Sequence, residues 1–258
     1  MSESVLNFLE EKNLPEVTKK KHTYLMMDGH DQEDIYVLKD GVVKVSIVLC
    51  DGREFNITYL KGLDMISLLK DEINKMTTAS FHARIESDTA TFYRINRKLF
   101  EQYVKENEEL QAYIDSYYRK KMTEAIYRQQ LMTMNGKNGA VCAFIYHLIP
   151  LFGRQVKKGI FIDLQITNDD IASFCGVSTR NSVNRILRGL REENVITMVY
   201  HKILILDVDY LKRYVQKREL IVSSFCCLIM SCTSTIVFLI LHQAYYKYYD
   251  CDTLMYCP

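Results

Sequence analysis

An excess of charge of one sign is absent from this sequence. Its 258 residues contain 33 lysines and arginines against 32 aspartates and glutamates, which leaves a net charge of +1. This balance excludes a chain that is basic throughout, so any binding to a nucleic acid must depend on positive charge gathered in one place. Tryptophan is also absent and proline occurs only three times, yet 48% of the residues are hydrophobic. A substantial core can therefore form.

Cysteine is scarce in most of the chain. Cys50, Cys142 and Cys175 are scattered over the first 225 residues, and the other five lie in the last 33. Isolated cysteines of this kind favour a reduced, cytoplasmic protein over a disulfide framework. The opening stretch MSESVLNFLEEKNLPE is acidic and lacks the apolar run of a secretory signal, so we also expect no export.

Motifs that support catalysis are missing as well. The sequence has no Ser-His-Asp arrangement, no paired carboxylates and no phosphate-binding loop. Its six histidines are isolated from one another, and such histidines are more typical of a surface or a core than of a catalytic site. They are His22, His30, His82, His147, His201 and His242. We therefore expect a binding protein and not an enzyme.

The first part of the chain, residues 1–96, has the pattern of a small antiparallel β-structure. Asp40-Gly41 and Asp51-Gly52 each separate runs rich in valine, isoleucine and tyrosine, and Asp-Gly between such runs is typical of a β-hairpin. The run FHARIESDTATFYRI alternates around Ser87-Asp88 and indicates one more pair of strands. We expect a small antiparallel barrel or roll.

Residues 97–134 contain neither glycine nor proline and are rich in helix formers. A continuous helix over this range would be about 57 Å long. One series of its side chains follows a 4-3-4-3 spacing that suits a partner helix: Tyr118, Met122, Ala125, Gln129 and Met132. We expect a dimerisation helix over 97–135, and the alternative is a long helix laid on its own roll. The stretch Asn135–Gly139 indicates a domain boundary.

Residues 136–218 are expected to form a winged helix-turn-helix. A buried helix over 140–152, a loop GRQVKKG and a strand over 160–164 precede two short helices. Thr167 and Asp170 can form a capping box for the first helix, Gly176 permits a sharp turn, and Ser178 or Thr179 can cap the second helix. The following run VITMVYHKILILDV predicts a hairpin, the wing, with His201 and Lys202 at its tip.

The second of these helices has two different faces at a spacing of about 100° per residue. Its apolar face consists of Val183, Ile186, Leu187 and Leu190. Asn181, Arg185 and Arg188 fall almost opposite, and Arg180, Ser182 and Asn184 flank them. From Gly176 to Arg191 there are four arginines and no carboxylate, whereas a generic solvated helix mixes signs.

This polar face suits the major groove of double-stranded DNA. Arginine can donate two hydrogen bonds to guanine, asparagine can pair with adenine, and hydroxyls near a helix N-terminus can donate to phosphates. The expected DNA-binding residues are Thr179, Arg180, Asn181, Ser182, Asn184, Arg185, Arg188 and Lys202. The alternative is a membrane-tethered scaffold whose winged helix serves only for protein contacts.

The chain resembles the Crp/Fnr family of bacterial transcription regulators over residues 1 to about 215. The resemblance is carried by LKDGVVKV, CDGREFNITYLKG and ARIESDTATFYRI in the roll and by ITNDDIASFCGVSTRNSVNRILRGLREENVI in the helix pair. NGKNGAVC and DVDYLKRY look like the PrfA-like branch. The family implies an α+β protein in which a cyclic-nucleotide-binding-like β-roll, a long dimerisation helix and a winged helix-turn-helix follow one another.

The resemblance also implies partners and contacts. It implies a homodimeric regulator that binds a palindromic site with one recognition helix per half-site and that contacts RNA polymerase. We expect an activator, and the alternative is a repressor. The family's base contacts carry over onto Arg180, Asn181 and Arg185. The middle residue is commonly glutamate in the family, so Asn181 should shift the preference from cytosine towards adenine.

The sensor half departs from the members that bind cyclic nucleotides. Those carry a Gly-Glu pair and an arginine that holds the cyclic phosphate, but KGLDMISLLKDEINKMTTAS has Thr77-Thr78 where the arginine is expected. A buried phosphate would lack its partner, so we expect no cyclic nucleotide. We likewise expect no iron–sulfur cluster, because the cysteines before the tail are scattered.

The PrfA-like branch can instead respond to glutathione. Tyr59, Lys61 and Gly62 match its Tyr-x-Lys-Gly stretch, so a glutathione-like peptide is one candidate effector. Lys61 could pair with the carboxylate of such a peptide. The alternative is a lysine at the end of a strand that is simply solvated.

The tail, residues 219–258, has no counterpart in the family. Residues 220–241 are 22 in number and carry no charge, which is long enough for a membrane-spanning helix. Lys212, Arg213, Lys217 and Arg218 precede it and would keep the regulator half in the cytoplasm. The alternatives are an abnormal extension of the chain or a helix buried on the body.

Overall fold

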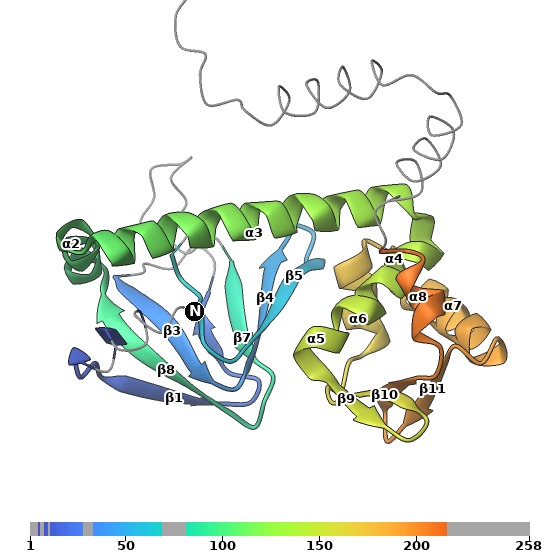
Figure 1. The fold of residues 1–258 in the computed structure, drawn as a ribbon. Helices are drawn as coiled ribbons and strands as arrows, with labels where there is room; N and C mark the ends of the chain where they lie inside the picture. The colour runs from blue at the N-terminus through green and yellow to red at the C-terminus, as the bar shows by residue number, and fades with distance from the viewer. Residues whose placement is uncertain (1–4, 6–7, 10, 28–32, 69–80, 216–258) are drawn as a thin grey trace, which may run out of the picture. The chain divides into compact units, whose positions relative to one another are not determined.

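The computed structural model describes residues 5, 8–9, 11–27, 33–68 and 81–215. Figure 1 shows β-strands at the start of the chain, a long helix, and a second module of helices and short strands. The strands of the first part are β1 (Glu16–Lys20), β2 (Tyr24–Met26), β3 (Asp34–Asp40), β4 (Val42–Val48), β5 (Glu54–Lys61), β6 (Asp64–Met65), β7 (His82–Ile85) and β8 (Thr89–Asn96).

These strands form the roll as two four-stranded antiparallel sheets. One has the order β1-β8-β3-β6 and the other β2-β7-β4-β5. Apolar side chains from both sheets, among them Leu38, Val43, Ile85 and Phe92, are fully buried and pack together in one cluster. The predicted antiparallel roll is thus confirmed.

Only one of the two predicted Asp-Gly hairpins exists. β4 and β5 pair from Val42–Lys61 to Val48–Glu54, so Asp51-Gly52 closes a hairpin. The prediction for Asp40-Gly41 was wrong, because β3 and β4 belong to different sheets and the chain turns a corner there. The strands around Ser87-Asp88 are present, but they too belong to different sheets.

The predicted continuous helix over 97–134 is two helices. The helix α2 (Arg97–Glu106) ends at Asn107, whose backbone is extended at φ −131° and ψ 104°. The side chain of Asn107 accepts a hydrogen bond from the amide of Leu110 and so starts α3 (Glu108–Met134). One side of α3 lies on the roll, where Leu110 and Ile114 are buried and the Tyr117 hydroxyl donates to the Met65 carbonyl at 2.6 Å.

The second module begins almost without a linker. Asn135 alone is non-helical after α3, and α4 (Gly136–His147) and α5 (Ile149–Phe152) follow at once. The expected break over 135–139 is therefore one residue long, and the expected helix over 140–152 is divided. The expected loop GRQVKKG contains β9 (Gly153–Val156), which pairs with β10 (Gly159–Ile162).

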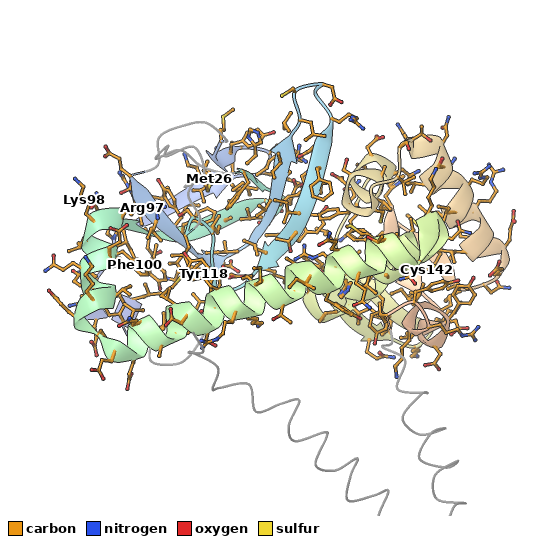
Figure 2. All side chains as sticks on the ribbon, turned by 90° about the horizontal axis from the view of Figure 1, so that it is seen from above. Met26, Arg97, Lys98, Phe100, Tyr118 and Cys142 are labelled. Atoms are coloured by element: carbon orange, nitrogen blue, oxygen red, sulfur yellow. The ribbon has the colours of Figure 1, made fainter. Side chains whose placement is uncertain are left out.

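The module is completed by α6 (Asn168–Cys175), α7 (Arg180–Glu192), β11 (Ile196–Val199), β12 (Lys202–Ile205) and α8 (Val208–Lys212). Its strands form one sheet in the order β11-β12-β10-β9. Its core includes Cys142, which Figure 2 labels on α4, together with Ile145, Ile171 and Val183. The expected α+β architecture is confirmed, while the exact domain boundaries stay a prediction.

The predicted membrane segment 220–241 lies outside the described residues. Among the helices that the structure describes, none is both long enough and apolar enough to cross a bilayer.

Candidate nucleic-acid interface

The first helix of the pair, α6, is fixed at both ends by local chemistry. The Asp170 amide donates to Thr167 Oγ1 at 3.0 Å, and the Thr167 amide donates to Asp170 Oδ2 at 3.2 Å, so the predicted capping box is present. Gly176 ends the helix in the left-handed region at φ 61°. Glycine adopts this conformation without steric cost, which allows the chain to turn sharply towards α7.

The second helix, α7, is capped by Thr179 and not by Ser178. Thr179 Oγ1 accepts from the Ser182 amide at 3.2 Å and lies 2.9 Å from the Ser182 hydroxyl. Two of the hydroxyls that were expected to contact phosphates are thus also engaged in capping the helix. A hydroxyl can still turn its proton towards a phosphate while its oxygen accepts from the backbone.

The two faces of α7 lie as predicted. Val183, Leu187 and Leu190 are buried and Ile186 is half-buried. The polar residues Arg180, Asn181, Asn184, Arg185 and Arg188 are all exposed. The acid-free polar face of α7 is therefore directed to solvent and is free to meet a ligand.

The charge on this face is largely uncompensated. Within the described part of the chain, the guanidinium groups of Arg185 and Arg188 make no ion pair. Arg180 lies 3.8 Å from Asp169, but both side chains are about two-thirds exposed at 68% and 66%. Exposed pairs of this length contribute little, so Arg180 can exchange this partner for a phosphate or a base.

The wing is the hairpin of β11 and β12, with Tyr200 and His201 at its tip. Both tip residues have positive φ angles of 50° and 62°, and the Tyr200 side chain is 90% exposed. Lys202 belongs to β12, where its ammonium lies 2.6 Å from Asp163 and over the ring of Phe161. Lys202 is thus less available to DNA than expected. Tyr200, which the sequence places in this turn, was not among the expected DNA-binding residues.

A cavity of about 410 Å³ lies at the other predicted site. Tyr59 and Lys61 line it, whereas Gly62 does not. Tyr59 is 6% exposed and packs against Phe152 and Phe174, with ring centroids 5.8 and 4.8 Å away. The Lys61 ammonium donates to the Leu151 carbonyl at 2.8 Å, so it is anchored and not merely solvated.

The cavity also holds polar side chains that the sequence interpretation missed. They come from α3 and α4 and include Lys121, Glu124, Arg128 and His147. Burial, followed by the nearby charge of Arg128, lowers the pKa of His147, and its Nε2 has no hydrogen-bond partner within the described residues. Thr77 and Thr78, which bear on cyclic-nucleotide binding, lie outside the described residues.

The predicted dimer residues form an apolar stripe along α3. Met122 is 65% exposed and Tyr118 39%, and Ala125 and Gln129 are exposed beside them. Figure 2 labels Tyr118 on the helix. Met132 is half-buried and lines the cavity. Ile126, at 59% exposure, was missed, although it follows Met122 by four residues and extends the stripe.

The sequence is similar to those of known proteins. Residues 139–214 match the family model of the Crp-like helix-turn-helix domain. The Lactate racemization regulatory protein of Lactiplantibacillus plantarum is 54% identical over 209 residues, which are 81% of this chain and 95% of that protein. The Listeriolysin regulatory protein of Listeria monocytogenes is 24% identical over 220 residues, or 84% of this chain and 92% of that protein.

A solved structure has the same fold. FixK2 from Bradyrhizobium japonicum superimposes with a TM-score of 0.67 at 16% identity, over 79% of this chain and 98% of that chain. At this identity the likeness concerns the arrangement of the elements alone.

Proposed function

The chain belongs to the Crp/Fnr family of transcription regulators, and from this premise we propose that it binds a palindromic promoter site as a homodimer. The observation that carries this proposal is the exposed, acid-free polar face of α7. A helix-turn-helix places such a face in the major groove, and two copies related by a two-fold axis read two half-sites about one helical turn apart.

The polar side chains of α7 divide into two roles. Arg180, Asn181 and Arg185 are the base readers, with arginine donating to guanine and Asn181 pairing with adenine. Arg188, Asn184, Thr179 and Ser182 position the helix on the phosphate backbone. Lys202 contributes only after leaving Asp163, so we rank it below the residues of α7.

Selection of bound sites from random DNA tests this function. The expected result is a palindrome with adenine and guanine at defined positions of each half-site. Arg185→Ala should cost about 1–3 kcal/mol and relax the preference at one base position. Arg191→Ala is a matched control on the same helix, because its Nε already donates to the Leu187 carbonyl at 3.2 Å. Unchanged affinity in Arg185→Ala would show that this residue does not contact a base.

Homodimer formation is supported by the apolar stripe of Tyr118, Met122, Ala125 and Ile126 on α3. Apolar side chains repeated along a helix are costly to leave in water, and a second copy of α3 would cover them. Met132 lies at the cavity end of the series and is half-buried already.

The signal is proposed to enter through the cavity and not to be a cyclic nucleotide. A glutathione-like peptide, implied by the resemblance at Tyr59 and Lys61, has carboxylates that suit Lys61 and Arg128 in the lining. Lys121 also lines the cavity, but it would have to leave Asp64, to which it is bonded at 2.8 Å. Calorimetric titration with glutathione and with cyclic AMP tests this. Heat from glutathione alone is expected, and heat from cyclic AMP alone would reverse the proposal.

The target genes are proposed from the name of the first relative, which assigns it to the regulation of lactate racemisation. We propose that this chain activates genes of the same process through RNA polymerase in the cytoplasm. Transcription in vitro from such a promoter, with purified polymerase, tests activation directly.

The remaining candidate function is a scaffold tethered to the membrane by residues 220–241, with the winged helix used for protein contacts. Binding to promoter DNA that weakens steeply with salt separates the two, because release of counterions requires the phosphate backbone. Site selection with and without the last 40 residues also measures whether the tail matters.

A further inference from the structure

Lys44 is a lysine buried completely between the roll and the helix-turn-helix. Its side chain comes from β4 and is 1% exposed. The ammonium lies 2.9 Å from Asp170 Oδ1, on the first turn of α6, and 3.1 Å from a carboxylate oxygen of Glu54, on β5. A charge from the sensor half thus contacts the start of the DNA-binding helix pair.

Asp170 uses its two oxygens for different purposes. Oδ2 accepts from the amide and the hydroxyl of Thr167, at 3.2 and 2.7 Å, and so caps α6. Oδ1 accepts from Lys44 of the roll. The backbone of the same residue is held as well, because Asn56 Nδ2 of β5 donates to the Asp170 carbonyl at 3.3 Å. The first turn of α6 is therefore fixed by the helix itself and by two strands of the roll.

This contact is better suited to define a geometry than to add stability. Removing an ammonium and a carboxylate from water costs several kcal/mol per ion, and the attraction of the pair largely offsets that cost without exceeding it. Two neighbouring atoms, Ser46 Oγ and Asn56 Oδ1, are buried without a hydrogen-bond partner within the described residues. An interface of this kind fixes the direction in which the roll and the helix pair meet, but it adds little free energy to hold them together.

The backbone connection alone does not fix the angle between α3 and the helix pair. Asn135 is the single non-helical residue between α3 and α4, and its φ of −98° and ψ of 0° lie in the right-handed region but depart from the angles of a regular helix. Rotation at Asn135 would change the angle of the whole helix pair relative to α3. Apolar packing of Tyr59 against Phe174 and the hydrogen bond from Lys61 to the Leu151 carbonyl also hold the module near the roll. Among these contacts, the bonds that reach the helix pair itself are those of Lys44 and Asn56 to Asp170.

We infer that Lys44 is a positioning residue for DNA recognition: by binding Asp170 it sets the angle of the helix pair, and hence the distance between the two recognition helices of a dimer. The inference rests on the proposed function of a dimer on a palindrome. Lys44 touches no DNA. In the arrangement that Lys44 holds, the polar face of α7 is exposed, as DNA binding requires.

Comparison of a full palindrome with a single half-site tests this role, using the full-length chain and the selected site. Binding to one half-site requires no fixed distance between the two recognition helices, whereas binding to both half-sites does. When that distance is no longer fixed, the effective concentration of the second recognition helix at the second half-site falls. Lys44→Met is expected to weaken binding to the palindrome by about tenfold or more while the half-site affinity stays within twofold. Fluorescence anisotropy with the two duplexes gives both values.

Two further variants define the mechanism. Asp170→Asn retains an acceptor for Thr167 but not the charge, and it should reproduce the loss; it also serves if Lys44→Met does not fold. The double variant should lose no more than either single variant, since both remove one contact. Lys39→Met is the control, because Lys39 is also a strand lysine bonded to a glutamate, Glu16, but both residues belong to the roll and lie on its surface.

Each outcome decides the matter. Equal losses on the palindrome and the half-site would show a merely structural role and overturn the inference, and so would a tenfold loss in Lys39→Met. A palindrome affinity that is unchanged in whichever of Lys44→Met and Asp170→Asn folds overturns it too. If the wild-type chain binds no palindrome better than a half-site, the proposed function is wrong. The measurement on the wild-type chain alone shows this, so that failure is distinguished from a failure of the inference on Lys44.

Discussion

Gly41 lies directly against Ala90, at the corner where the chain passes from one sheet of the roll to the other. A Cβ atom at Gly41 would be 2.6 Å from the Cβ of Ala90 and 2.8 Å from the Thr89 carbonyl oxygen. The φ of Gly41 is +109°, outside the range that other residues adopt readily. The close approach and the backbone angle together require glycine at this position.

Gly41→Ala is therefore expected to lower the free energy of unfolding by about 2–5 kcal/mol, from backbone strain and a contact too short to relax. Urea denaturation followed by circular dichroism measures it. Gly189→Ala is the contrasting control, because a Cβ there meets nothing within 4 Å and the residue lies in α7. It should raise stability by about 0.5–1 kcal/mol. Equal stability of Gly41→Ala and wild type would contradict the claim that this corner requires glycine.

Gly41 also explains why the sequence predicted some parts of the fold and not others. Asp40-Gly41 and Asp51-Gly52 are the same dipeptide, but only the second closes a hairpin. The difference lies in strand pairing far along the chain: β3 pairs with β8, so that Tyr36 faces Arg94. Periodicity and turn residues carry no information on partners this distant.

The helix pair could be predicted because its determinants are local. The caps at Thr167 and Thr179 and the turn at Gly176 each involve residues within three or four positions. Asn107 marks the limit of this approach, since an asparagine inside a helix-forming run gave no sign that its side chain would cap α3. The polar lining that α3 and α4 add to the cavity, and the role of Lys44, were missed because these residues meet partners far away along the chain.

Arg188→Ala is expected to reduce the salt dependence of DNA binding. One phosphate contact fewer releases about one counterion fewer, so the slope of log K against log salt should become shallower by about 1. Titrations between low and physiological salt measure the slope. Arg94→Ala removes the same charge from the roll, where Arg94 is bonded to Asp34 at 2.6 Å, and should leave the slope as in wild type. An unaltered slope in Arg188→Ala would place this residue away from the backbone of DNA.

Met122→Glu is expected to weaken the dimer at least tenfold. A carboxylate at a 65% exposed position costs nothing in the monomer, but in the dimer it would be desolvated against the apolar stripe of the partner. Sedimentation over a range of concentrations measures the association. Ser116→Glu, on an exposed part of α3 away from the stripe, is the control and should leave association unchanged. Equal association of all three proteins would reject α3 as the interface.

The stability of the protein is expected to depend on His147 near neutral pH. Burial, together with the charge of Arg128, lowers the pKa of His147 below its ordinary value of 6.5, although Glu124 opposes this. As the pH falls through 6.5, the unfolded chain therefore takes up a proton before the folded chain does. The contribution of the neutral imidazole to stability is present above this pH and is lost as the pH falls towards the folded pKa.

Removing the titrating group should remove this loss. His147→Phe retains a ring against Tyr127, whose centroid is 5.8 Å from that of His147, and cannot take up a proton. Between pH 7.5 and 5.5 its free energy of unfolding should fall less steeply than that of wild type, by at most about 1.4 kcal/mol per pH unit. Parallel curves for His147→Phe and wild type in urea denaturation would mean that His147 titrates equally in both states.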